Sequence, residues 1–142
     1  MYYGRPGYME TAAIPCLDSP MHSPHKSKGG LSRLLNALRY SMRGLAAAFR
    51  HEAAFRQESL LAAVLVPLAI WISDSVSQAL LLIGALAFVL IVELLNSALE
   101  ALADTVTLEE HPLIARAKDL GSAAVLLAII VALLVWAAVI WH

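Results

Sequence analysis

The feature that most constrains this chain is a series of three apolar runs without charged residues. They occupy residues 59–73, 75–92 and 120–141. Their lengths are about 15, 18 and 22 residues, against the roughly 17–25 that a membrane-spanning helix needs. The hydrophobic fraction of 60% also exceeds the ~45–50% usual in soluble domains. We therefore predict an all-α membrane protein with three transmembrane helices, at residues 53–73, 77–103 and 118–141.

The basic residues are distributed unevenly around these spans. Eight of the ten Lys and Arg residues precede the first apolar run, and the other two, Arg116 and Lys118, lie between the second run and the third. Because basic residues are retained on the cytoplasmic side of a membrane, we expect the N-terminus and the loop at 104–119 to be cytoplasmic. The turn at Asp74 and the C-terminus then lie outside. An aromatic belt at that outer side is indicated by three tryptophans, Trp71, Trp136 and Trp141.

The segment before the first span divides into two parts. Residues 1–30 hold most of the prolines and glycines without an apolar period, which predicts a disordered tail, and they lack the apolar core of a signal peptide. In residues 31–50, apolar side chains recur at helical spacing, at Leu31, Leu34, Leu35, Leu38, Met42, Leu45 and Phe49. The opposite face is rich in arginine. We predict an amphipathic helix in the cytoplasmic membrane interface, with packing on other protein as the alternative.

A polar stripe ends the second apolar run. Glu93, Asn96, Glu100 and Asp104 follow one another at i, i+3, i+7 and i+11, which places them on one face of a helix. An ionisable side chain at membrane depth is costly and normally faces a protein interior or a water-filled site. The stripe is therefore the main candidate for a functional site, with Asp104 at its exit toward the cytoplasm.

Further polar residues fall at the same cytoplasmic level. Glu52 precedes the first span, and Lys118, Asp119 and Ser122 open the third. The His-Glu pair at 51–52 does not begin a zinc-protease motif H-E-x-x-H, because the second histidine is missing. The single cysteine of the chain excludes an intrachain disulfide.

The carboxylates of this layer outnumber its cations, which favours a bound divalent metal. Mg²⁺ is the natural candidate because it prefers oxygen ligands and often shares them with substrate phosphates. A further carboxylate could act as a general base, and phosphoryl transfer requires these parts. No glycine-rich nucleotide loop of a known type is present. A small proton-coupled transporter with Glu93 or Glu100 as the relay fits equally well, so the residues alone leave both classes open.

Three blocks of sequence carry a family resemblance, EAAFRQE at 52–58, IVELLNSALE at 91–100 and RAKDLGSAAV at 116–125. In order and spacing they resemble the bacterial integral-membrane diacylglycerol kinases. The resemblance implies a homotrimer of three-span subunits in the bacterial inner membrane, each with an N-terminal surface helix. It implies transfer of the γ-phosphoryl group of MgATP to the hydroxyl of diacylglycerol, giving phosphatidic acid. Undecaprenol kinase of the same fold shares these motifs and is the closest alternative.

The resemblance also implies roles for individual residues. Glu93 corresponds to the catalytic base, and Glu52 and Glu100 correspond to the Mg²⁺ ligands. The implied nucleotide-binding positions are Glu52, Glu100, Asn96, Lys118, Asp119 and Ser41. The implied substrate-binding positions are Arg33, Glu93, Gln57, Glu58 and Ser122. The expected partners are ATP, diacylglycerol or another lipid alcohol, membrane lipid and further copies of the chain, with no nucleic acid.

Overall fold

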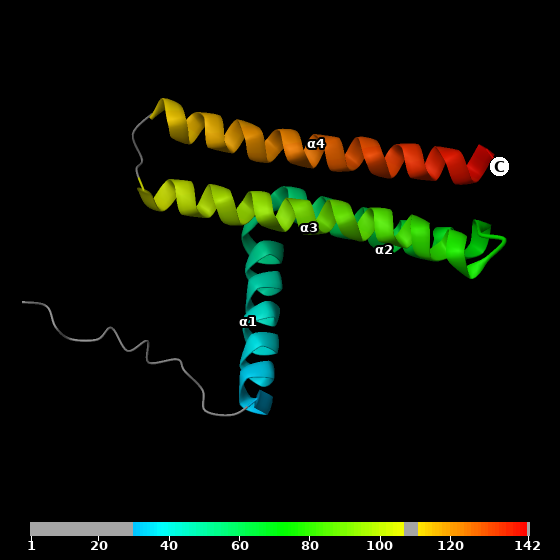
Figure 1. Cartoon of the computed structure of the whole chain (residues 1–142), viewed down its shortest axis with the longest axis horizontal. Helices are drawn as coiled ribbons and strands as arrows, with labels where there is room; N and C mark the ends of the chain where they lie inside the picture. Colours follow the sequence, from blue (N-terminus) through cyan, green and yellow to red (C-terminus); the bar gives the residue numbers. More distant parts are fainter. Residues whose placement is uncertain (1–29, 107–110, 142) are drawn as a thin grey trace, which may run out of the picture.

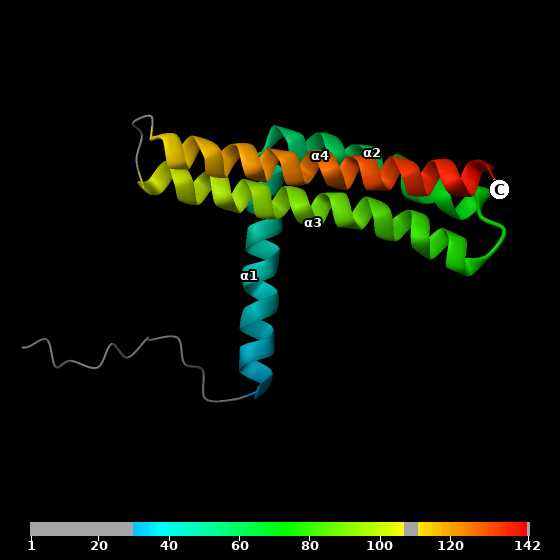
Figure 2. The same cartoon turned by 45° about the horizontal axis from the view of Figure 1, so that its top comes forward.

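The computed structural model describes residues 30–106 and 111–141, and within these ranges the chain is entirely helical apart from short connections. The helices are α1 (Gly30–His51), α2 (Ala53–Ile72), α3 (Val76–Val106) and α4 (Pro112–Trp141). Helices α2, α3 and α4 run side by side, and α1 leaves them crosswise (Figure 1). The same arrangement is seen after a turn of the molecule about the horizontal axis (Figure 2). The all-α prediction is confirmed for these residues, while residues 1–29 of the predicted tail lie outside them.

Three helices are long and apolar enough to cross a membrane: Ala53–Ile72, Val76–Thr105 and Pro112–Trp141. They leave large apolar side chains on their outer surfaces, where Leu61 is 57% exposed and Leu134 is 64% exposed. Contiguous apolar surface of this kind is unfavourable in water, whereas in a bilayer it contacts lipid or another helix. Three such helices agree with the prediction of a multi-pass membrane protein.

Helix α4 begins at Pro112, upstream of the span predicted at 118–141. Proline suits the first position of a helix, where its missing N–H leaves no hydrogen bond unmade. The carbonyl oxygen of His111 accepts the N–H groups of Ile114 and Ala115 at 2.9 and 3.0 Å, so the first turn is well formed. Hydropathy indicates which part of the helix can cross the membrane, whereas His111 and Pro112 set where the helix starts.

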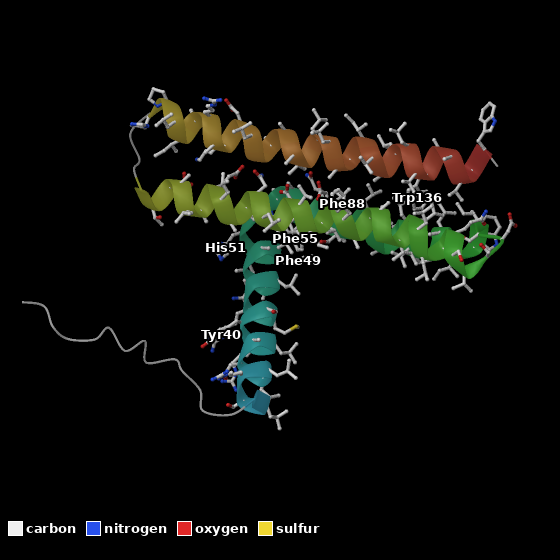
Figure 3. All side chains as sticks on the ribbon, viewed as in Figure 1. Tyr40, Phe49, His51, Phe55, Phe88 and Trp136 are labelled. Carbon is white, nitrogen blue, oxygen red and sulfur yellow. The ribbon has the colours of Figure 1, made fainter. Side chains whose placement is uncertain are left out.

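Helix α1 covers the residues predicted as a surface helix at 31–50. Its nitrogen-bearing side chains project to one side and its apolar side chains to the other (Figure 3). The apolar side chains are largely exposed, with Leu31 at 72% and Leu38 at 59%, and Ala48 is the one buried residue of this helix. Helix α1 therefore meets the bundle near its C-terminal end and leaves an apolar face open along the rest.

The packing core joins α3 to α4. Val89 of α3 packs with Ala128 and Ala132 of α4, which are 2% and 8% exposed. Small side chains allow two helices in lipid to approach closely. Val89, Glu93 and Asn96 follow at i, i+4 and i+7 and so share one face of α3. The packing therefore sets α4 along the face that carries the polar stripe.

Candidate active site

The candidate site lies beside the junction of α1 and α2, which is marked by His51 and Phe55 in Figure 3 and lies part-way along α3. Glu93 is its most buried charged group, with 4% of its surface exposed. Glu52 and Glu100 are both close enough to Glu93 to repel its charge, and Glu58 lies within the same range of Glu93. Sequence blocks that are far apart in the chain thus bring three further carboxylates within electrostatic range of Glu93. A carboxylate cluster at this depth is costly, which supports a functional role.

Asn96 is held between two neighbours. Its Nδ2 donates a hydrogen bond to Glu100 Oε1 at 3.1 Å, one helical turn further along α3. Its Oδ1 is buried and has no hydrogen-bond partner among residues 30–106 and 111–141. That oxygen lies against the backbone of Gly121, because a Cβ built on Gly121 would overlap it. Helix α4 can approach the stripe this closely only because residue 121 has no side chain.

Lys118 lies at the other end of the stripe. Its Nζ forms an ion pair with Asp104 Oδ1 at 2.6 Å, which joins α4 to α3. The side chains are 39% and 61% exposed, so the pair contributes little stability, typically ~0–1 kcal/mol. The pair instead fixes where the ammonium group lies. An ammonium has three N–H donors, so Lys118 can bind a further anion without leaving Asp104.

A groove of about 660 Å³ opens between α1, the corner at Glu52, and α3. Ser41 and Glu52 line it together with Ser97, a residue that the sequence analysis did not select. Ser97 is 8% exposed, and its Oγ has no hydrogen-bond partner in the part of the chain that is described. It follows Glu93 by four residues, so its position on the same helix face was available from the spacing.

A second groove, of about 500 Å³, lies between α2, α3 and α4 and is almost wholly apolar. Glu58 opens into it with a buried Oε2 that no described group satisfies. Trp136 lines the same groove, and its Nε1 is likewise buried without a partner in the described ranges. Trp136 therefore faces this groove, whereas Trp71 and Trp141 are 83% and 94% exposed.

The remaining predicted residues are not drawn into this cluster within one copy of the chain. These residues have exposed side chains and are Arg33, Gln57, Asp119 and Ser122. Asp119 follows Lys118 by one residue and so projects about 100° away from it around α4. One copy of the chain therefore assembles the carboxylates and the amide, and leaves the other predicted residues on open faces.

The comparison with known proteins bears on this arrangement. The family pattern described as prokaryotic diacylglycerol kinase matches residues 39–140, which include all three blocks and the four clustered glutamates. The chain belongs to this family. Its resemblance to the bacterial diacylglycerol kinases, noted from the sequence, is thereby confirmed.

Several relatives match this family member over most of their length. A protein from Pseudomonas aeruginosa named diacylglycerol kinase is 51% identical over 83% of this chain and 96% of its own. A protein of the same name from Escherichia coli K12 is 47% identical over 79% of this chain and 92% of its own. A third, from Haemophilus influenzae, is 40% identical over 79% and 95%.

The residues of this family member can be tested for their fit to Mg²⁺. No group of three or more His, Cys, Asp or Glu side chains that could enclose a metal occurs in residues 30–106 and 111–141. Mg²⁺, however, usually takes one or two carboxylates and completes its shell with water and phosphate oxygens. Glu52 and Glu100 approach Glu93 from different elements and supply two such carboxylates. The donor set fits a metal that arrives with a phosphate ligand and does not fit a metal held by protein alone.

Proposed function

We propose that this chain transfers the γ-phosphoryl group of ATP to the hydroxyl of diacylglycerol, giving phosphatidic acid and ADP. The observation that carries the proposal is the buried Glu93 with Glu52 and Glu100 beside it, in a member of the prokaryotic diacylglycerol kinase family. The relatives from three genera bear the name diacylglycerol kinase, which favours this lipid over undecaprenol.

Glu93 acts as the general base. As the lipid oxygen forms its bond to the γ-phosphorus, the hydroxyl proton passes to the Glu93 carboxylate and the bond from phosphorus to the β–γ bridging oxygen breaks. Burial of Glu93 supports this role, because a site closed to bulk water limits hydrolysis of ATP in place of transfer. A well-placed base of this kind contributes about 10²–10⁴-fold to the rate.

The nucleotide side of the site uses the other polar residues. Glu52 and Glu100 would hold Mg²⁺, which supplies positive charge to the phosphates. Asn96 keeps Glu100 in place through its hydrogen bond, and Lys118 offers a cation to the phosphates. Ser41 shares the α1 groove with Glu52, which supports contact with the nucleotide on that side.

The lipid side uses the apolar groove between the three long helices. Its lining suits acyl chains, and Glu58 is the polar group that the lipid headgroup would meet there. Gln57, Arg33 and Ser122 complete the headgroup contacts. The side chains of Gln57, Arg33 and Ser122 are exposed in a single copy of the chain, so we propose that the site is completed between subunits of a homotrimer.

The proposed orientation follows from the charge distribution. The N-terminus and the connection between α3 and α4 lie in the cytoplasm of the bacterial cell, and the C-terminus lies outside the inner membrane. Helix α1 lies in the cytoplasmic interface with its exposed leucines toward lipid and its arginines toward headgroups. This places the glutamate cluster where a cytoplasmic nucleotide and a membrane lipid can meet.

The test is an assay in mixed micelles with MgATP and, in parallel, diacylglycerol or undecaprenol. We expect phosphatidic acid from the first lipid, and a rate at least 10²-fold lower for Glu93→Gln. Asp74→Asn, which removes an exposed carboxylate in the connection between α2 and α3, at the far end of α2 from Glu52, is the matched control and retains activity. A near-normal rate for Glu93→Gln would show that Glu93 is not the general base. Absence of turnover with both lipids, together with proton-coupled uptake in vesicles, would replace the kinase with a transporter.

A further inference from the structure

The corner between α1 and α2 is built from a single residue. Helix α1 ends at His51 and α2 begins at Ala53, so Glu52 alone turns the chain, with an extended backbone at φ −99° and ψ 115°. Glu52 makes no side-chain cap to α2, which leaves its carboxylate available to the site. The direction of that carboxylate therefore depends on what holds the corner.

The last carbonyl groups of α1 require partners, since the final turn of a helix has no N–H groups ahead of it. The N–H of Glu52 satisfies the carbonyl of Ala48 at 2.9 Å. The next two carbonyls are satisfied from the following helix: Arg56 Nη1 donates to Arg50 O at 3.0 Å and to Phe49 O at 3.4 Å. A guanidinium at this place also carries positive charge to the negative end of the α1 dipole.

Arg56 thereby joins two helices across the corner. It belongs to the first turn of α2, and its backbone N–H also bonds Glu52 O at 3.3 Å. Packing supplies little alternative restraint on the direction of α1, because Ala48 is the one buried residue in that helix. Figures 1 and 2 show α1 projecting from the bundle with its far end free of α2, α3 and α4.

We propose that Arg56 is a positioning residue, which fixes the α1–α2 corner by capping the end of α1 and so holds the Glu52 carboxylate beside Glu93. The proposal rests on the proposed function for the role of Glu52 in binding MgATP. In this proposal Arg56 acts through Glu52 and not through a contact of its own with nucleotide or lipid. Its removal acts by letting Glu52 leave its binding position.

The first test measures the corner without reference to activity. Spin labels are placed at Ala37→Cys on α1 and Ile70→Cys on α2 in a Cys16→Ser background, and labelled protein is diluted with unlabelled protein to suppress distances between copies. We expect one narrow distance distribution for the parent and a broad one for Arg56→Gln. Arg43→Gln, which removes an exposed arginine of α1, is the matched control and keeps the narrow distribution. An equally narrow distribution for Arg56→Gln overturns the proposal.

The second test measures the consequence for the site. If Glu52 occupies its position about a tenth of the time in Arg56→Gln, the Mg²⁺ concentration for half-maximal activity rises about tenfold, equal to ~1.4 kcal/mol. The KM for lipid stays within twofold. Arg56→Lys, which keeps the charge and N–H donors but loses the planar guanidinium, gives an intermediate shift and also serves if Arg56→Gln fails to fold. If Arg56→Gln broadens the distance distribution but leaves the Mg²⁺ concentration for half-maximal activity unchanged, Arg56 does not position Glu52.

The two hypotheses fail in different ways. If the parent protein phosphorylates no lipid, the proposed function fails while the distance measurement still decides whether Arg56 holds the corner. If the parent is active and Arg56→Gln raises the KM for lipid in place of the Mg²⁺ requirement, Arg56 is a lipid contact and the positioning role is wrong.

Discussion

The contact between Gly121 and Asn96 leads to the sharpest prediction from this structure. A Cβ at residue 121 would overlap Asn96 Oδ1 at well under 3.0 Å, and would also lie 3.4 Å from Asn96 Cγ and 3.7 Å from Leu99 Cδ2. In Gly121→Ala, therefore, either the Asn96 amide turns away or α4 moves from α3. The first response breaks the hydrogen bond to Glu100, and the second loosens the alanine packing around Val89.

The size of the effect follows from these two responses. Overpacking a well-packed interface by one methyl group typically costs about 1–3 kcal/mol. Loss of the Asn96 bond to a carboxylate gives a similar figure, about 1.5–3 kcal/mol. We therefore expect Gly121→Ala to lower the free energy of unfolding by about 1–3 kcal/mol, although alanine alone favours a helix by up to ~1 kcal/mol over glycine.

The assay is unfolding in mixed detergent micelles, followed by circular dichroism, with activity measured on the same samples. Gly84→Ala is the matched control, because a Cβ at that position on α3 meets nothing within 4 Å. It should leave stability unchanged or slightly increased. Activity separates the two responses: an amide that turns away raises the KM for ATP and leaves the KM for lipid unchanged.

A double-mutant cycle tests the reasoning directly. Asn96→Ala removes the oxygen that a Cβ would meet, so Gly121→Ala should cost nothing further in that background. The predicted coupling energy is about 1–3 kcal/mol. If the two substitutions have additive effects, or if Gly121→Ala and Gly84→Ala are equally stable, the overlap with Asn96 is not the cause of the lost stability.

Three other predictions use the same preparations. Lys118→Gln should raise the KM for ATP about tenfold, because a phosphate loses its cation, whereas Asp104→Asn should change it less than threefold, because an exposed ion pair contributes only ~0–1 kcal/mol. A larger rise in the KM for ATP for Lys118→Gln than for Asp104→Asn shows that Lys118 acts on the nucleotide and not only through its ion pair with Asp104. Leu82→Ala should lower unfolding stability by about 2 kcal/mol or more, since Leu82 is 0% exposed and leaves a cavity; Leu80→Ala, at 65% exposed, is its control. Chelation of Mg²⁺ should abolish lipid phosphorylation, and Ca²⁺ at equal concentration should not restore it, because Mg²⁺ requires tighter octahedral geometry.

The spans and the face of the polar stripe could be predicted from the sequence because both depend on local properties. A spanning helix is a matter of length and composition, so the apolar runs were sufficient for α2, α3 and α4. The spacing of Glu93, Asn96 and Glu100 fixes their common face once α3 is helical. Helix α4 extends upstream of the apolar run because Pro112 sets the start of the helix, whereas hydropathy reports only the part that can cross a membrane.

Contacts between helices could not be predicted in this way. The Asp104–Lys118 pair and the Asn96–Gly121 contact both depend on the register of α4 against α3. Spacing within either helix carries no information about that register, since it is set by the packing of Val89 against small residues of α4. The capping of α1 by Arg56 is similar, because it depends on the turn that Glu52 makes.

The same register bears on how much of the site a single copy can supply. Lys118 points toward Asp104, and the next residue, Asp119, is turned about 100° around α4 and is exposed. The two residues therefore cannot both face the stripe of their own α3. If both contact the nucleotide, as the family resemblance implies, the nucleotide lies at the edge of α4 between them, and the proposed homotrimer would supply the rest of the site from a second copy. The assignment of Asp119 to the nucleotide site and the proposed homotrimer thus depend on one another.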